Sequence, residues 1–406
     1  MDLRKTLFFA CLAQCCGVLC FIGIKNLGLP FLLKSLNYDD STILLMVSSL
    51  SIFNVFHVFL SVFLSGRRIK YLLIFNYLIG HLFLAAICVG YYFDKISALL
   101  LIIGVFGYFF FTGLGDTFWW PFIHPQIPQL KVSDFFTRLR VTWATFSFLG
   151  VIALKNIANG LVGPKEFSIF IFFMGIFGAC RMIFLSPLKI KGAQNFDDPL
   201  DFKKFIKLIK KFKNYHELYF IFFFVFFEPL FFGTALVLYL NDLGVSQGDN
   251  FLVGGVGLLS TIISLLFVNN QLKKVEEKTL VNKMKIPVIV NLALIPCVSL
   301  IPQREIIIFV VIFLKFFMGL ISAGANLIYI NKLFNHIDPR NRTVSMGVFN
   351  LAIFVVFFVS EFFFSWCLRI SKNIGVFENK FILPFLVYFL IGVIFYFYQR
   401  KKHYSK

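Results

Sequence analysis

Long apolar stretches, repeated along almost the whole chain, constrain this sequence more than any other feature. Of the 406 residues, 59% are hydrophobic and 15% are charged, and phenylalanine alone fills 59 positions. An ordinary soluble domain carries about 25% charged residues, because its surface has to be polar. A lipid bilayer is therefore the expected solvent, and the composition excludes a large soluble catalytic or nucleic-acid-binding domain.

Twelve of these stretches are long enough to cross a bilayer, which takes about 20 residues in helical form. They cover residues 7–33, 42–64, 71–93, 97–127, 139–162, 167–185, 216–240, 250–268, 286–302, 305–332, 345–370 and 381–398. The stretches at 167–185 and 286–302 are near the lower limit of length. Because continuous apolar runs without alternation satisfy their backbone in lipid only as helices, we predict an all-α polytopic membrane protein.

Lys and Arg are distributed unevenly between the two sets of predicted loops. With the N-terminus inside, 28 of the 39 lie on the cytoplasmic side and eight on the opposite side. Cytoplasmic loops of membrane proteins carry such an excess of positive residues. We therefore place both termini in the cytoplasm, expect a bacterial inner membrane, and attribute most of the net charge of +19 to topology rather than to a nucleic-acid partner.

The longest polar interruption divides the predicted spans into six and six. We predict an N-terminal six-helix bundle over residues 1–190, a basic cytoplasmic linker over 191–215 and a C-terminal six-helix bundle over 216–406. Residues 201–212 of the linker alternate Phe or Ile with Lys at helical spacing. This pattern is typical of an amphipathic helix that lies on an anionic leaflet.

Two short patterns recur in corresponding places of the two predicted bundles. Phe110-Phe-Thr-Gly-Leu114 reappears as Phe316-Phe-Met-Gly-Leu320, and an Asp followed four positions later by Arg occurs in both inside loops that precede the fifth span of a bundle. This agreement favours a duplicated six-span unit, which is one route to a transporter. The residues that we expect in cytoplasmic gating loops are Arg67, Arg68, Asp134, Arg138, Asp338 and Arg342.

The architecture resembles the major facilitator superfamily over nearly the whole chain. Gly66-Arg67-Arg68 is similar to the end of that family's Gly-x-x-x-Asp-Arg-x-Gly-Arg-Arg-like loop motif, although its acidic position is Phe63 and its first glycine is Phe59. This departure puts the family's usual charge contact at that loop in doubt.

The fourth predicted span carries a second point of resemblance. Gly113-Leu-Gly115, Pro121 and the later Arg138 resemble the family's glycine-rich fourth helix and the loop that follows it. The resemblance implies two pseudo-symmetric bundles, a central cavity lined by the first, fourth, seventh and tenth helices, and secondary transport.

Five ionisable residues lie in the middle of predicted spans: Lys25, Asp116, Glu228, Lys315 and Glu361. Each such charge costs about 2.5–3.5 kcal/mol in a bilayer, so residues of this kind normally face a cavity and mark a pathway. The first four fall on the spans that the resemblance assigns to the cavity.

Each lysine of this set can neutralise one carboxylate, which leaves one acid free to carry a proton. Glu228 is the first choice for proton coupling, because the following Pro229 bends the helix and frees a backbone carbonyl. Asp116 and Glu361 are the alternatives, and static pairs that orient the bundles are another interpretation of the same charges. We set Arg181 aside, because near a span end it can extend to the headgroups.

The predicted solute site combines charged, aromatic and amide side chains. Trp119 and Trp120 lie one turn from Asp116, where flat rings could stack on a sugar or a heteroaromatic ring, although ordinary packing explains them equally well. The full set of predicted substrate-binding residues is Lys25, Asp116, Trp119, Trp120, Lys315, Gln14 and Asn326.

The sequence contains no motif of a nucleotide-binding loop, a zinc protease or a serine hydrolase, and no Cys-x-x-Cys. We therefore predict no enzyme activity, no cofactor and no metal. The predicted function is secondary active transport, by a monomer, of a small polar or amphiphilic solute, sugar-like or otherwise organic, coupled to H⁺ or to Na⁺. The alternatives are a receptor or scaffold with a degenerate carrier fold, and a membrane-embedded enzyme.

Overall fold

The computed structural model describes residues 3–64, 69–123, 126–127, 132–188, 207, 210, 219–271, 277–336, 342–375 and 377–404. In this part of the chain every regular element is a helix. The elements are α1 (Leu3–Ile22), η1 (Gly23–Gly28), α2 (Leu29–Ser35), α3 (Asp40–Ser49), η2 (Leu50–Ile52), α4 (Phe53–Phe63), α5 (Ile69–Tyr92), α6 (Ala98–Ile123), α7 (Val132–Asn159), α8 (Pro164–Leu185), α10 (Tyr219–Phe232), α11 (Thr234–Asp242), α12 (Gln247–Gln271), α13 (Glu277–Cys297), η6 (Val298–Leu300), α14 (Arg304–His336), α15 (Arg342–Ile374) and α16 (Ile382–Tyr404).

Several short elements join end to end into single membrane crossings. Among the described residues, 11 helical segments are long and apolar enough to span a bilayer, and Ile382–Tyr398 in α16 is a shorter apolar helix. The prediction of an all-α protein with about twelve spans is therefore confirmed. The predicted short stretch at 167–185 belongs to α8, which has 22 residues. The last apolar helix, Ile382–Tyr398, falls below the length of the 11 candidate spans instead.

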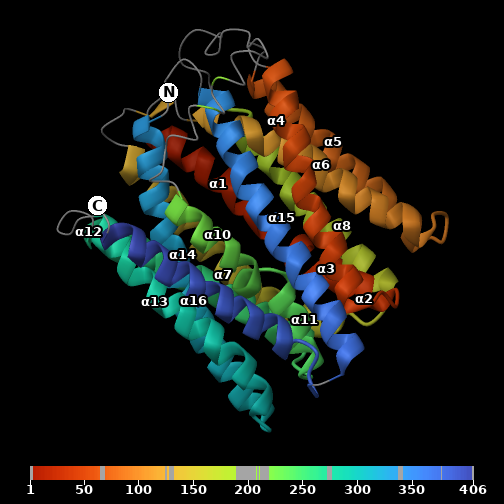
Figure 1. Ribbon diagram of the computed structural model, residues 1–406. Coiled ribbons are helices and arrows are strands. Elements are labelled where there is room, and N and C mark those ends of the chain that lie inside the picture. Colours follow the sequence, from red (N-terminus) through yellow and green to blue (C-terminus); the bar gives the residue numbers. More distant parts are fainter. Residues whose placement is uncertain are drawn as a thin grey trace.

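The helices cross the molecule roughly side by side, so that both chain ends lie at one end of the bundle (Figure 1). We call this end the terminal end, and the end that carries the α2–α3, α11–α12 and α15–α16 connections the far end. Helices α1 to α8 form the N-terminal half and α10 to α16 the C-terminal half. The halves touch where α7 lies along α12 and where α15 lies along α3 and α4.

Close contact between α7 and α12 depends on glycine. A Cβ added at Gly248 would lie 2.4 Å from the Lys155 carbonyl oxygen, and one at Gly255 would lie 2.7 Å from the Val151 side chain. Small residues of this kind let membrane helices approach closely where no hydrophobic driving force acts between them. These two helices therefore join the halves by backbone proximity.

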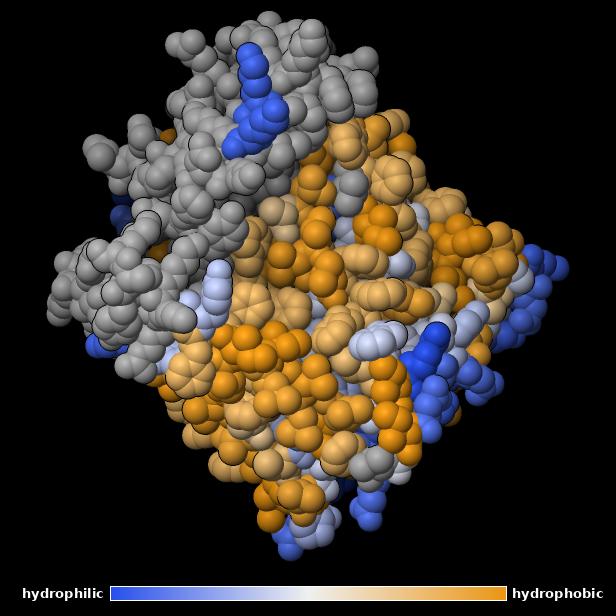
Figure 2. All heavy atoms as spheres, in the orientation of Figure 1, coloured by the Kyte–Doolittle hydropathy of each residue, from blue (hydrophilic) through white to orange (hydrophobic). Residues whose placement is uncertain are grey.

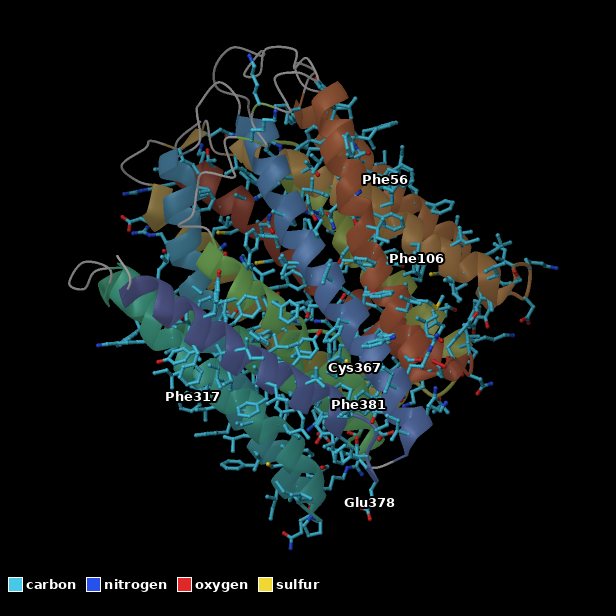
Figure 3. The ribbon with its side chains drawn as sticks, in the orientation of Figure 1. Phe56, Phe106, Phe317, Cys367, Glu378 and Phe381 are labelled. Carbon is cyan, nitrogen blue, oxygen red and sulfur yellow. The ribbon has the colours of Figure 1, made fainter. Side chains whose placement is uncertain are left out.

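The outer surface of the bundle is apolar. Phe309 is 70% exposed, and Phe56 and Phe317, which Figure 3 labels, are 54% and 39% exposed. Figure 2 shows apolar residues covering the middle of one face, with hydrophilic residues gathered at the far end. Soluble monomers rarely expose so much contiguous apolar surface, so the protein is an integral membrane protein with many spans.

The structure bears differently on three predicted features: the linker, the bend at Pro229, and the loop that was expected to hold Asp134 and Arg138. The predicted linker, with its amphipathic helix at 201–212, lies outside the described residues except for Lys207 and Lys210. Pro229 is inside α10, and a break at Gly233 separates α10 from α11, as the predicted bend requires. Asp134 and Arg138 lie inside the first turns of α7 rather than in a loop.

Candidate functional site

A cavity of about 320 Å³ opens between helices of the N-terminal half. Its wall comes from α1, η1, η2, α4 and α6, with one residue from α15. The lining residues are Phe21, Lys25, Leu50, Ser51, Asn54, His57, Val58, Phe109, Thr112, Gly113, Asp116, Thr117 and Phe354. The predicted site residues Lys25 and Asp116 thus share one cavity.

Two of the cavity walls are irregular helices. Lys25 lies in a π-helical turn, Gly23–Gly28, and Ser51 lies in a short 3₁₀ turn, Leu50–Ile52. In membrane proteins such departures from the α-helix occur where the backbone lines a cavity rather than lipid, and π-helical turns occur frequently at functional sites. The local geometry therefore points to the same place as the charges.

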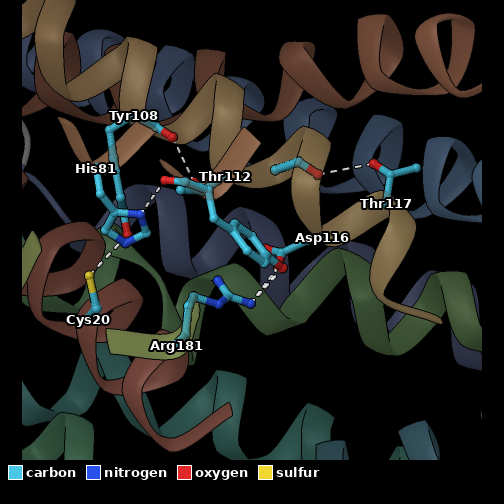
Figure 4. A network of polar contacts seen from close by, with 9 residues as sticks. Cys20, His81, Tyr108, Thr112, Asp116, Thr117 and Arg181 are labelled. Atoms are coloured by element: carbon cyan, nitrogen blue, oxygen red, sulfur yellow. Dashed lines mark hydrogen bonds and ion pairs between the residues drawn. The ribbon is translucent and has the colours of Figure 1, made fainter. Parts of the chain in front are cut away.

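Asp116 is held by a network of buried groups in the N-terminal half (Figure 4). The Tyr77 hydroxyl donates a hydrogen bond to Asp116 Oδ1 at 2.5 Å, and Arg181 Nη2 lies 3.1 Å from the same oxygen. Arg181 Nη2 also donates to the Tyr77 hydroxyl at 2.6 Å, and its guanidinium lies 3.6 Å from the Tyr77 ring centroid. The other carboxylate oxygen, Oδ2, accepts none of these bonds.

Arg181 corrects a prediction, because it does not extend to the headgroups. It is 6% exposed, whereas the Asp116 side chain that it contacts is 53% exposed and faces the cavity. A Cβ at Gly17 would lie 2.8 Å from Arg181 Cζ, so the glycine on α1 makes room for the guanidinium. Counter-charge and space together draw the arginine inward, and neither is visible from its position near a span end.

The network continues behind Asp116 through His81, Cys20 and Tyr108, which do not line the cavity, and through Thr112, which does. The His81 ring Nδ1 lies 2.6 Å from the Tyr77 carbonyl oxygen, and Cys20 Sγ lies 3.0 Å from the Tyr108 hydroxyl. Thr112 donates to the Tyr108 carbonyl oxygen at 2.7 Å. Among the described residues, His81 Nε2 and Arg181 Nε have no hydrogen-bond partner, so the network supports Asp116 through the bonds of Tyr77 and Arg181 Nη2.

The mid-span charges of the C-terminal half are not paired in this way. Among the described residues, Glu228, Lys315 and Glu361 form no ion pair within 4.0 Å. Lys315 is 5% exposed, with its ammonium 5.5 Å from the Phe232 ring centroid. Glu361 is 4% exposed, and its Oε2 has no hydrogen-bond partner in the part of the chain that is described.

Lys25 is the cation that connects the two halves electrostatically. The charge of Lys25 acts on both Glu228 and Glu361, and Glu228 also interacts with the Ser322 hydroxyl and with the charge of Arg140. The expected pairing of each lysine with one carboxylate is therefore wrong. Asp116 takes Arg181 as its partner, whereas Lys25, Lys315, Glu228 and Glu361 form no ion pair within 4.0 Å among the described residues.

Trp119, Gln14 and Asn326 of the predicted site do not line this cavity. Trp119 is 3% exposed within an apolar cluster, which favours its packing interpretation. Gln14 is half-buried on α1, and Asn326 accepts a hydrogen bond of 3.4 Å from Arg140. The side chain of Trp120 lies outside the described residues.

Several polar residues of the cavity were not predicted as site residues. His57 is 2% exposed, and its ring lies close enough to Gly113 that a Cβ there would be 2.5 Å from His57 Cε1. His57 Nδ1 also lies 3.3 Å from Asn54 Oδ1. Single polar residues in a span normally join helices together. Two of them one turn apart, Asn54 and His57, were the feature of the sequence that could have indicated a polar cavity here.

The predicted gating residues are described only in part. Asp134 and Arg138 are exposed on α7, near the terminal end. Arg342 begins α15, and its side chain lies outside the described residues, as do Arg67, Arg68 and Asp338 altogether.

At the far end, four charged residues form a cluster that we call the far-end latch: Lys34, Asp40, Asp242 and Lys380. Lys380 Nζ lies 2.6 Å from Asp40 of the N-terminal half and 3.0 Å from Asp242 of its own half. Lys34 adds a contact of 3.5 Å to Asp40. Burial alone would lower the pKa of Lys380, but the hydrogen bonds and charges of Asp40 and Asp242 raise it.

Further polar contacts cross between the halves near the latch. Lys155 Nζ lies 2.8 Å from Asp249 Oδ1, and the Gly248 amide donates to Asn159 Oδ1 at 2.8 Å. The Ser365 hydroxyl donates to the Ser41 carbonyl oxygen at 2.7 Å. The far end is thus closed by contacts between the two halves.

Comparisons with known proteins place this geometry in a fold. No protein-family model matches the chain, and no curated protein matches it. Solved structures do match. The nucleoside transporter NupG is 13% identical, with a TM-score of 0.65 and 98% of each chain covered. A partially occluded, inward-open structure of the xylose transporter XylE from E. coli is 14% identical, with a TM-score of 0.68 and 97% of each chain covered. The POT family transporter PepTSo is 12% identical, with a TM-score of 0.69 and 100% of each chain covered.

At these identities the matches establish the fold and nothing finer. The chain has the fold of the major facilitator superfamily, and the resemblance expected from the sequence is confirmed at the level of architecture. Function has to be argued from the chain's own cavity and charges.

Proposed function

We propose that this protein is a secondary active transporter that moves a small polar or amphiphilic organic solute by alternating access. The single observation that carries the proposal is the cavity that holds Lys25 and Asp116 at mid-span, between irregular helices. Intramembrane charges that face a cavity mark a solute or ion pathway. The similarity of the fold to transporters of nucleosides, xylose and peptides supports the same class.

The far-end latch supports alternating access in particular. Ion pairs between the two halves hold the far end closed, which supports a route for solute through the terminal end in this conformation. Rocking of one half against the other would break the latch and open the far end. With the orientation inferred from the positive residues, the terminal end is cytoplasmic and this conformation faces inward.

Coupling to a proton gradient is part of the proposal, with Na⁺ as the other candidate ion. Glu228 remains the first choice for the coupling group, with Glu361 and Asp116 as alternatives. Glu228 and Glu361 share one lysine, so a change in the position of Lys25 alters the charge that both carboxylates experience. The protein would act as a monomer in a bacterial inner membrane, with its basic linker on the anionic cytoplasmic leaflet.

Uptake by purified protein in proteoliposomes tests the proposal. A pool of labelled sugars, nucleosides, amino acids and organic acids is offered with and without an imposed pH gradient, and then with a Na⁺ gradient. We expect one class to accumulate in response to the pH gradient. A receptor or scaffold would take up none of them under either gradient, and an enzyme would form product in detergent without any gradient.

A further inference from the structure

The cavity of the N-terminal half presents two unlike charged groups to one solute. Lys25 Nζ has no ion-pair partner within 4.0 Å among the described residues, and its nearest aromatic neighbour is the Phe21 ring, 5.5 Å away. Asp116 accepts the hydrogen bonds of Tyr77 and Arg181 on Oδ1, and its Oδ2 accepts none from the described residues. Figure 4 shows the contact between Asp116 and Arg181. A donor and an acceptor of opposite charge therefore remain available.

The rest of the lining indicates what lies between those two charges. Phe21, Phe109 and Phe354 contribute aromatic surface from three different helices. Ser51 and Thr117 add hydroxyl groups. Asn54, His57 and Thr112 are further polar residues of the lining, so aromatic and polar surfaces are mixed here. In ligand pockets such polar groups fix the orientation of the ligand.

We propose that the solute is zwitterionic, with its acidic group at Lys25, its ammonium group at Asp116 Oδ2 and an apolar body against the three phenylalanines. This inference rests on the proposed function and narrows its solute class. A sugar or a nucleoside offers hydroxyl groups to Asp116 but nothing that needs the ammonium of Lys25. A simple amine or a simple acid leaves one of the two charged groups without a partner.

The supporting network explains why Asp116 can receive a cation although it already contacts Arg181. The Arg181 guanidinium lies on the Tyr77 ring and is buried behind the carboxylate, while the carboxylate itself is 53% exposed. Arg181 therefore fixes Asp116 from behind and leaves its front face to the cavity. Hydrogen bonds to charged groups contribute about 1.5–3 kcal/mol each, so losing either end of the solute lowers affinity by about tenfold or more.

Direct binding to the full-length protein in lipid nanodiscs tests the inference, with calorimetry as the readout. The probes are L-phenylalanine, phenethylamine and 3-phenylpropanoate, which carry both charges, the ammonium alone and the carboxylate alone. The dipeptide Gly-Phe and 5-aminopentanoate extend the zwitterion set to larger charge separations. We expect at least one zwitterion to bind tenfold more tightly than the compounds that carry one charge.

Variants at Lys25 and Asp116 test which of the two residues binds which end of the solute. Lys25→Gln should remove the preference for the zwitterion over phenethylamine and keep its preference over 3-phenylpropanoate. Lys25→Arg should restore the preference over phenethylamine. Asp116→Asn should do the opposite. Lys95→Gln, an exposed lysine of the α5–α6 connection, is the matched control and should change neither. If Asp116→Asn fails to fold, the Lys25 pair of variants still decides the matter.

Two results would overturn the inference: no zwitterion binds better than the compounds with a single charge, or the preference survives in Lys25→Gln. Accumulation of a sugar or a nucleoside in proteoliposomes would then leave the proposed function standing with another solute class. Tight binding of a zwitterion without any uptake would support the proposed binding site and contradict the proposed transport function.

Discussion

The two halves of the molecule treat charge in the membrane differently. In the N-terminal half, Asp116 has a buried arginine partner and a tyrosine hydrogen bond. In the C-terminal half, Glu228, Lys315 and Glu361 have no ion pair within the described part of the chain. A buried charge without a partner is costly, and such groups persist where their charge changes during function.

The difference suggests a division of labour between the halves. A paired and supported carboxylate keeps one position and one charge, which suits recognition of a solute. An unpaired carboxylate near a lysine that belongs to the other half responds when the halves move, which suits coupling. Under the proposed function, the N-terminal half would bind the solute and the C-terminal half would sense the coupling ion.

The largest expected effect comes from breaking the ion pair between Asp116 and Arg181 in the N-terminal half. Arg181→Met leaves Asp116 and Tyr77 without their buried cation, and breaking a buried pair in this way costs about 3–5 kcal/mol. We expect a corresponding fall in the free energy of unfolding, measured by denaturant titration in detergent.

Lys315→Met is the matched control for that experiment. It removes a lysine that is buried to the same degree but has no ion pair, so it should change the free energy of unfolding by less than about 1 kcal/mol or increase it. Equal losses in Arg181→Met and Lys315→Met would contradict the comparison between the halves.

The next effect concerns transport. Glu228→Gln removes a titratable group, so accumulation driven by the pH gradient should disappear while exchange of solute across the membrane continues. With one proton per solute, a gradient of one pH unit drives accumulation by about tenfold, and this is the factor that the variant should lose.

Proteoliposome uptake and counterflow measure the two activities separately. Glu361→Gln and Asp116→Asn are tested beside Glu228→Gln. Accumulation that survives in Glu228→Gln but not in one of the others would move the coupling role to that residue, and accumulation that survives in all three would end the proton hypothesis.

A smaller effect is expected at the far-end latch. Lys380→Gln removes the contact between Asp40 and the C-terminal half, which contributes about 1 kcal/mol for a partly exposed pair. The ratio of open to closed far ends should rise by about fivefold, measured by electron-electron resonance between spin labels at the exposed positions 95 and 378, in a background without native cysteines. Glu378 stands at the far end in Figure 3.

The control is Lys165→Gln, which removes an ion pair with Asp94 that lies entirely within the N-terminal half. It should leave the ratio unchanged. Because the pKa of Lys380 is raised, its contribution is complete below the unfolded value of 10.5 and is lost only as the pH rises through the folded value. The far end should therefore stay closed between pH 6 and about pH 9.

The last effect concerns Asp39, the N-cap of helix α3, which carries the latch residue Asp40. Asp39 caps α3, and its carboxylate accepts a hydrogen bond of 2.6 Å from the Thr42 amide. Burial alone would raise its pKa, but hydrogen bonds from Thr42 and Ser41 and the charge of Lys372 lower it below 3.8. Asp39→Ala should therefore lower the free energy of unfolding by about 0.5–2 kcal/mol.

The pH dependence gives this prediction its direction. Because the pKa is lowered on folding, the contribution of Asp39 is present above the unfolded value of 3.8 and is lost as the pH falls through the folded value. Asp39→Asn keeps the cap without a titratable group, so its unfolding should lack that loss in acid. Identical acid profiles for the wild type and Asp39→Asn would contradict the assignment.

Sequence reasoning found the fold and part of the site. The length of an apolar segment decides where a chain crosses a bilayer, so the spans could be predicted closely. The free-energy cost of a charged side chain in lipid singled out Lys25 and Asp116, which share a cavity. The partner of Asp116 could not be predicted, because Arg181 is 65 positions away and its direction depends on the space left by Gly17. Pairing requires knowledge of helix rotation, which uniformly apolar spans do not encode.

The amino-acid sequence by itself determined that this is a helical membrane protein with many spans, because the backbone of a long apolar segment satisfies its hydrogen bonds in lipid only as a helix. Only the tertiary structure decided which charges meet. Asp116 and Arg181 come together in one half, Asp40 and Lys380 meet across the two, and Glu228 and Glu361 form no ion pair among the described residues, since such contacts depend on how the helices pack rather than on their composition.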